Sequence, residues 1–172
     1  MSPAVVQSVL LFVGSQGAWF ACVLGAAYGW PWVGVLATAL WIGVWAARRE
    51  RPRADLAFLA IVGAVGWVVD SALVLYGAFG FPEAARLGGP SPLWMVALWI
   101  GFGTTLRALA PLLAMPIVAV AVGALAGPLA YNGGVAFGAA RFGEDAWASR
   151  LVIAAAWAAA LPLLVAVERR VR

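Results

Sequence analysis

The chain has 172 residues, of which 65% are hydrophobic and 10% charged, with a net charge of +4 and a mean hydropathy of +0.98. A soluble domain needs a polar surface that this composition does not supply, which excludes a water-soluble enzyme or binding module. Histidine is absent and cysteine occurs once, so we expect no disulfide, no metal site and no cofactor. The basic residues flank apolar runs without forming a stripe, so nucleic-acid binding is not indicated either.

Six apolar runs predict an all-α membrane bundle of six transmembrane helices that forms one domain over residues 1–172. In chain order, the predicted spans cover residues 4–27, 32–47, 56–76, 93–110, 116–140 and 147–167. A charged segment at 48–53 follows the second span, and a loop rich in glycine and proline at 77–92 follows the third. Residues 168–172 read as a short charged tail.

The distribution of arginine predicts the orientation of these spans, because positive residues accumulate on the cytoplasmic side. With the N-terminus inside, eight arginines are cytoplasmic and three are outside, whereas the reverse topology inverts the ratio. We therefore expect both termini in the cytoplasm. All 11 basic residues are arginine, and alanine, glycine and valine are abundant. This bias is typical of a GC-rich bacterial genome, so the expected location is a bacterial cytoplasmic (inner) membrane.

The tryptophans fall into two sets along the predicted spans. Trp30, Trp32, Trp94 and Trp147 fall at the predicted outer interface, and Trp41 and Trp45 fall near the inner end of the second span. Amphipathic indoles favour the headgroup level, so we interpret these six as interfacial anchors. The other four, Trp19, Trp67, Trp99 and Trp157, fall well inside their spans.

Asp70 is the one acid deep inside an apolar run. An ionisable group is costly to bury in a membrane, so we treat Asp70 as a candidate functional residue. It lies about 21 Å above the inner end of its span, in the outer third of the membrane. Arg107 lies about 12 Å away in depth, too far to pair with Asp70. We expect Arg107 to extend instead toward the cytoplasmic headgroups.

Several polar and aromatic residues share the depth or the helix face of Asp70 and predict a pocket that leans outward. The candidate substrate-binding residues are Asp70, Ser71, Gln16, Tyr131, Asn132, Trp67, Trp19 and Trp99. Burial without a cation favours the neutral form of the Asp70 carboxyl. The alternative is that Asp70 only hydrogen-bonds Asn132 or Tyr131 and so holds helices together.

The fifth span is the least regular of the six. Gly127 and Pro128 fall near its middle, and a proline there removes a backbone hydrogen bond. We expect this helix to be broken near Pro128, which in transporter-like folds points to a binding site. A kink repaired by neighbouring helices is the simpler alternative. The small-residue pairs Gly25/Gly29, Gly123/Gly127 and Gly134/Gly138 favour close helix contacts.

Short motifs spread along the chain carry a resemblance to a known family. They are the run from Trp19 to Ala26 that leads to Pro31-Trp32, then Asp70-Ser71, Pro92-Leu93-Trp94, Leu98-Trp99, Thr104-Thr105-Leu106 and Gly127-Pro128-Leu129-Ala130-Tyr131. With these motifs the chain resembles a family of small bacterial inner-membrane proteins described only as a domain of unknown function. The resemblance covers nearly the whole chain and implies no reaction.

Three classes of function remain open. The first is binding or transport of a small amphipathic or lipid-like molecule at the Asp70 pocket, with membrane lipids as partners. The second is a scaffold or assembly subunit, whose partner is a second copy of the chain or another membrane protein. The third is a membrane-embedded lipid-modifying enzyme. Such an enzyme needs an acid–base pair or a metal site, and a single buried acid without histidine provides neither, so we name no catalytic residue.

Overall fold

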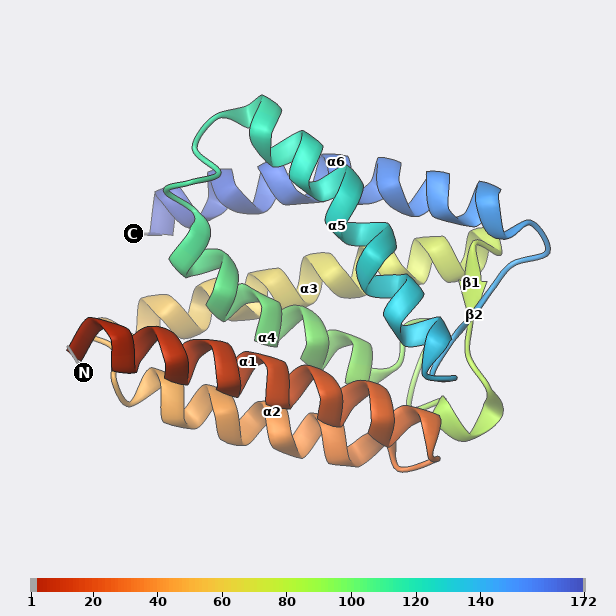
Figure 1. The fold of residues 1–172 in the computed structure, drawn as a ribbon, viewed down its shortest axis with the longest axis horizontal. Helices are drawn as coiled ribbons and strands as arrows, with labels where there is room; N and C mark the ends of the chain where they lie inside the picture. The colour runs from red at the N-terminus through yellow and green to blue at the C-terminus, as the bar shows by residue number, and fades with distance from the viewer. Residues whose placement is uncertain (1–2, 172) are drawn as a thin grey trace.

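The computed structural model describes residues 3–171, and these contain six α-helices (Figure 1). The helices are α1 (Pro3–Ala27), α2 (Pro31–Ala46), α3 (Pro52–Tyr76), α4 (Leu93–Leu109), α5 (Pro116–Ala136) and α6 (Ala146–Val171). A short 3-10 helix, η1 (Glu83–Ala85), and two short strands, β1 (Phe79–Gly80) and β2 (Arg141–Phe142), lie in the connections. The all-α class predicted from the sequence is therefore confirmed.

Proline and glycine set several helix ends. Proline occupies the first turn of α2, α3 and α5, where its missing N–H costs no helical hydrogen bond. Gly77 ends α3 in the left-handed conformation, with φ +84°, which side-chain-bearing residues rarely adopt. Two helices are longer than predicted, because α3 begins at Pro52 and α6 ends at Val171. The prediction of a charged tail from residue 168 is wrong, since Glu168 lies on α6.

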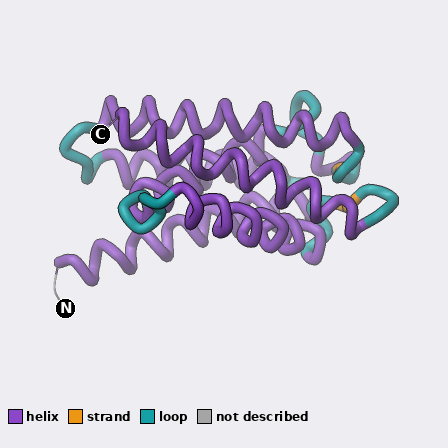
Figure 2. Tube along the Cα trace, turned by 90° about the horizontal axis from the view of Figure 1, so that it is seen from above, coloured by secondary structure: helices purple, strands orange, loops and turns teal. Residues whose placement is uncertain are grey.

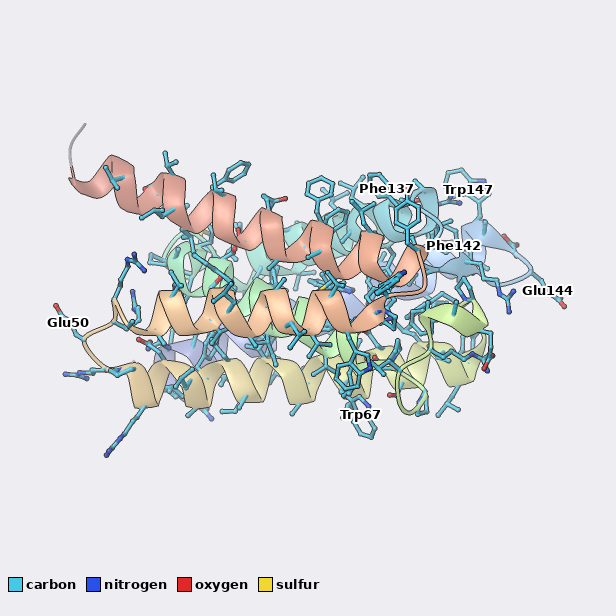
Figure 3. All side chains as sticks on the ribbon, turned by 90° about the horizontal axis from the view of Figure 1, so that it is seen from below. Glu50, Trp67, Phe137, Phe142, Glu144 and Trp147 are labelled. Carbon is cyan, nitrogen blue, oxygen red and sulfur yellow. The ribbon has the colours of Figure 1, made fainter. Side chains whose placement is uncertain are left out.

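The helices lie along the long axis of the molecule, with α5 inclined across the bundle (Figures 1 and 2). Both ends of the described chain lie at one end, which we call the terminal end, and β1 and β2 lie at the opposite one, the strand end (Figure 1). Figure 3 places Glu50 at the terminal end and Glu144 at the strand end. Of the main helix pairs, α1, α2 and α4 pack on one another, α3 packs on α4 and α6, and α5 packs on α6.

Four of the helices are long and apolar enough to cross a membrane: Ser8–Ala27 of α1, and all of α3, α5 and α6. The apolar helices α2 and α4 are shorter, at 16 and 17 residues. Large apolar side chains cover the outside of the bundle, among them Leu36 and Leu40 on α2 and Leu125 and Leu129 on α5, which are 67–71% exposed. A soluble monomer does not carry so much apolar surface, so this exterior suits lipid.

The expected break in the fifth span does not occur. Residues 116–136 form one continuous helix with Pro128 inside it. Membrane helices accommodate proline when nearby groups satisfy the freed backbone. The backbone group that Pro128 frees is the carbonyl of Ala124, four residues before it. The Asn132 side chain makes a different bond in the same helix, because its Nδ2 donates to the Pro128 carbonyl oxygen at 2.8 Å. The prediction of a broken helix at Gly127 and Pro128 is therefore wrong.

The strand end is closed by a packed aromatic cap. Residues Phe79 and Gly80 pair antiparallel with Phe142 and Arg141, which ties the α3–α4 connection to the α5–α6 connection. The ring of Phe79 lies edge-on to Phe81 and to Tyr131, at centroid distances of 5.3 and 5.0 Å. This cap covers the end of α5 that carries Tyr131.

Three of the six tryptophans interpreted as interfacial anchors, Trp30, Trp32 and Trp147, are exposed. Trp94 is instead fully buried, and its Nε1–H donates to the Ala85 carbonyl at 2.8 Å. Trp45 is also buried, under the Arg49 guanidinium. Trp41 is half-buried and donates to Thr104 Oγ1 at 3.3 Å. The anchor interpretation is therefore wrong for Trp94 and Trp45, because depth alone does not say which way a side chain turns.

Glycines create the space in which two inner tryptophans sit. A Cβ atom added at Gly66 of α3 would lie 2.0 Å from Trp99 Cγ, and one at Gly127 of α5 would lie 2.4 Å from Trp157 Cγ. A Cβ at Gly123 would lie 2.3 Å from the Trp157 carbonyl oxygen. The Gly123/Gly127 pair thus makes a close helix contact, as its spacing predicted, and the partner is α6.

Candidate ligand-binding site

Asp70 lies on α3 toward the strand end and is completely buried. One carboxylate oxygen accepts a hydrogen bond from Trp99 Nε1 of α4 at 2.8 Å. The other accepts a hydrogen bond from the Tyr131 hydroxyl of α5. The contact with the fifth helix matches the depth prediction, and Arg107 is not a partner of Asp70. The carboxyl group therefore joins three helices through two donors.

Two stacked indoles adjoin this hydrogen-bonded group. The rings of Trp99 on α4 and Trp157 on α6 lie nearly parallel, with a centroid distance of 4.4 Å and an interplanar angle of 19°. Phe102 and Tyr131 meet the Trp157 ring edge-on at 5.4 and 6.4 Å. Stacked and edge-on pairs are the favoured arrangements of aromatic rings, and they add to the stability that burial provides. The result is a rigid aromatic wall between α4, α5 and α6.

This wall lines a cleft of about 120 Å³ between α1 and α4 on one side and α5 and α6 on the other. We call it the aromatic cleft; its lining comprises Trp19, Val23, Phe79, Trp94, Met95, Leu98, Trp99, Phe102, Ala130, Tyr131, Gly134, Ala140 and Trp157. Asp70 itself does not line the cleft, because its carboxylate lies behind Trp99 and Tyr131. The predicted pocket is thus bounded by the donors to Asp70 and not by the acid.

A second cavity of about 140 Å³ adjoins the aromatic cleft and shares Trp19, Leu98 and Phe102 with it. It is more polar, since Ser15 and Gln16 of α1, Thr38 of α2 and Thr105 of α4 line it. Gln16 therefore lies in the neighbouring cavity and not beside Asp70. Together the two cavities follow the side of α4 that faces α1.

Three further candidate residues lie outside the aromatic cleft. Ser71 is buried and its Oγ accepts a hydrogen bond from the Ser91 backbone N–H at 3.3 Å. The Asn132 side chain bonds the Pro128 carbonyl and Arg150 Nε, so its amide is not available to Asp70. Trp67 is 45% exposed and points away from the bundle (Figure 3). Depth selected Asn132, the neighbouring position in sequence selected Ser71, and a shared helix face selected Trp67. In the structure each of these side chains turns elsewhere.

The structure contains a second buried polar cluster that the sequence did not predict. Arg107 of α4 is buried; its Nε lies 2.5 Å from Asp55 Oδ1, and its Nη1 lies 3.9 Å from Glu168 Oε1. Asp55 Oδ2 also accepts a hydrogen bond from Arg49 Nε at 2.8 Å. The Arg107 guanidinium lies over the Phe58 ring at 5.3 Å. This ion cluster joins α3, α4, α6 and the α2–α3 connection at the terminal end.

The expectation that Arg107 extends to the headgroups is therefore wrong. Its side chain ends inside the bundle because two buried acids receive it there. Both acids were assigned to segments outside the predicted spans, Asp55 one residue before the third and Glu168 one residue after the sixth. The signal that could have revealed them is their helical spacing from the apolar residues Phe58 and Leu164, which are fully buried.

Six apolar helices around a buried polar centre, four of them long enough to cross a bilayer, define the chain as a helical bundle of the membrane type. The chain belongs to the family described as "Protein of unknown function (DUF2878)", whose model matches residues 8–163. The family assignment predicted from the motifs is confirmed. Neither the curated proteins nor the solved structures contain a significant match to this chain.

Replacing Asp70 tests how its two hydrogen bonds contribute to stability. In Asp70→Asn the amide oxygen accepts from Trp99, and the Tyr131 hydroxyl can rotate to accept from the amide N–H. In Asp70→Leu both buried donors lose their acceptor, at a cost of about 1–3 kcal/mol each. We expect the leucine variant to have the clearly lower melting temperature in detergent. Equal, large losses in both variants would show that the carboxylate charge itself is required.

Replacing Arg107 tests the ion cluster. Arg107→Met leaves Asp55 and Glu168 buried without their shared cation, and such a loss costs about 3–5 kcal/mol. Arg86→Met is the matched control, because Arg86 pairs with Glu83 at 3.3 Å on the exposed surface, where an ion pair contributes about 0–1 kcal/mol. We expect a large fall in detergent melting temperature for Arg107→Met and almost none for Arg86→Met. A similar, small change in both would show that the cluster does not stabilise the bundle.

Proposed function

We propose that all six helices cross a bacterial cytoplasmic membrane, with both termini in the cytoplasm. At a rise of about 1.5 Å per residue, α2 and α4 extend about 24–26 Å, which approaches the thickness of a bilayer core of about 30 Å. They pack against α1, a candidate span. Both ends of the described chain lie at the terminal end, as an even number of crossings requires (Figure 1).

The arginines support this orientation as well. In this topology eight arginines of the sequence are cytoplasmic and three are external. Reporter fusions after Val171 and within the loop at 88–91 test the proposal. We expect a cytoplasmic signal from the first fusion and an external signal from the second. Signals from the same side would contradict it.

The second part of the proposal is that the aromatic cleft binds, or passes across the membrane, a small amphipathic or lipid-like molecule. The observation that carries it is an apolar cleft within an apolar bundle that has the Tyr131 hydroxyl in its wall, whose oxygen can accept a hydrogen bond while its proton is donated to Asp70. Ligand sites commonly combine an apolar lining with a few convergent polar groups. Its volume of about 120 Å³ compares with about 150 Å³ for a cavity that binds benzene, so it suits a ring or a chain segment.

A scaffold role is the second candidate, and one observation favours it. Both carboxylate oxygens of Asp70 already accept hydrogen bonds from neighbouring helices. An acid of this kind holds a bundle together without any ligand, as interhelical hydrogen bonds do in other membrane proteins. The two roles differ in one measurable respect: only the first requires that the cleft be open.

Filling the cleft separates the two roles. Gly134 of α5 lines the cleft, and a Cβ atom there meets nothing within 4 Å, so Gly134→Leu puts a side chain into the open space. Gly17→Leu on α1 is the matched control, since its Cβ is equally free and Gly17 lines neither cavity. We expect native mass spectrometry to show a bound lipid on the wild type and on Gly17→Leu, and loss of that lipid on Gly134→Leu. Equal lipid retention by the two variants would favour the scaffold.

A further inference from the structure

The second cavity, of about 140 Å³, holds polar side chains whose hydrogen bonds the protein does not complete. We call it the polar cavity. Gln16 of α1 and Thr105 of α4 line it, and neither side chain forms a hydrogen bond within the described part of the chain. Ser15 Oγ donates to the Phe12 carbonyl at 3.1 Å, and its oxygen can still accept. These groups mark a place for polar atoms that the chain itself does not supply.

The depth of Gln16 makes its unmet amide costly. Gln16 lies near the middle of α1 and is exposed, so the polar cavity is open toward the outside of the bundle. In the proposed topology the outside at this depth is hydrocarbon, where no water completes the hydrogen bonds of an amide. Transporters hold their substrates near the same depth, at the midplane of the bilayer.

The lining of the polar cavity favours an uncharged group. No arginine, lysine, aspartate or glutamate lines it among residues 3–171, so an ionised head would lack a counter-charge there. Asp70 lies behind Trp99 and Tyr131, which line the aromatic cleft and not the polar cavity. The Gln16 amide both donates and accepts, and so does the Thr105 hydroxyl. The matching group is a hydroxyl, which can do the same.

The polar cavity adjoins the aromatic cleft, and the two share Trp19, Leu98 and Phe102. One compartment offers hydrogen bonds and the other apolar surface, which suits a molecule with a polar head and an apolar chain. Resting on the proposed binding function, we propose that the ligand is an uncharged lipid whose hydroxyl head hydrogen-bonds Gln16 and Thr105 in the polar cavity. The adjoining part of its chain lies in the aromatic cleft. A long-chain alcohol and a monoacylglycerol both carry this chemistry.

Native mass spectrometry in a non-ionic detergent tests the inference with oleyl alcohol and with 1-octadecene, which has a chain of the same length and no hydroxyl. We expect the wild type to bind the alcohol roughly three- to tenfold more tightly, as a neutral hydrogen bond provides. Gln16→Leu keeps a side chain of similar size and suits a lipid-facing helix. It should abolish the preference for the alcohol and leave octadecene binding unchanged.

Two further variants and one control accompany this experiment. Thr105→Val replaces the hydroxyl with a methyl group and should also weaken binding of the alcohol alone. Gly134→Leu fills the aromatic cleft and should weaken binding of both probes. Ser8→Leu is the matched control for Gln16→Leu, because Ser8 is likewise exposed on α1 and lines neither cavity. We expect it to bind both probes like the wild type.

The outcomes are distinguishable. Equal affinity of the wild type for the alcohol and the alkene would overturn the inference but leave the binding function standing, and this comparison depends on no variant. Tighter binding of oleylamine or sodium oleate than of oleyl alcohol would overturn the uncharged head. A wild-type dimer that becomes a monomer in Gln16→Leu would overturn the inference as well, because the amide would then pair with a second copy.

Two other results bear on where and what the protein binds. Full retention of both probes by Gly134→Leu would overturn the placement of the chain in the aromatic cleft. Binding of neither probe to the wild type would overturn the proposed function itself. Monoolein in place of oleyl alcohol shows which of the two hydroxyl sources binds more tightly.

Discussion

Two buried acids on α3, Asp55 and Asp70, constrain the arrangement of the whole bundle. They are 15 positions apart, about 22 Å along the helix axis. Each acid takes a donor from α4 and connects to one further helix, through Arg107 to Glu168 of α6 at the terminal end and through Tyr131 of α5 at the strand end. An unpaired carboxyl in apolar surroundings is costly. The helices α3, α4, α5 and α6 therefore cannot slide or rotate without losing one of these clusters.

The aromatic cleft is a consequence of this arrangement. Because α3 packs on both α4 and α6 while α5 packs on α6, the bundle has two groups of helices with α3 between them. Tyr131 reaches from α5 to Asp70, and Trp157 from α6 stacks on Trp99 from α4. The cleft remains where these aromatic contacts do not fill the space between the groups. Glycine at 66, 123 and 127 lets the large rings approach the neighbouring backbones.

Lipid changes which forces hold such a bundle together. The exposed leucines of α2 and α5 gain little by packing inward, since lipid tails are as apolar as the protein interior. Close packing against glycine and hydrogen bonds between helices then carry the specificity of the fold. Two of these groups, Trp99 and Tyr131, also border the aromatic cleft, so the proposed binding role would use residues that stabilise the bundle.

The sequence by itself determined the helical class, the approximate position of all six helices and the importance of Asp70, because runs of apolar residues and the cost of a buried acid are local properties. It also predicted the contact with Tyr131 from depth, and a close helix contact at Gly123 and Gly127, whose partner α6 only the structure identified. Only the tertiary structure decided which way each side chain turns. Rotation about the helix axis directed Trp67 outward and Asn132 toward Arg150, and buried Trp94 beneath the cap. It also brought Arg107 to two acids that are distant from it in sequence, which no local pattern contains.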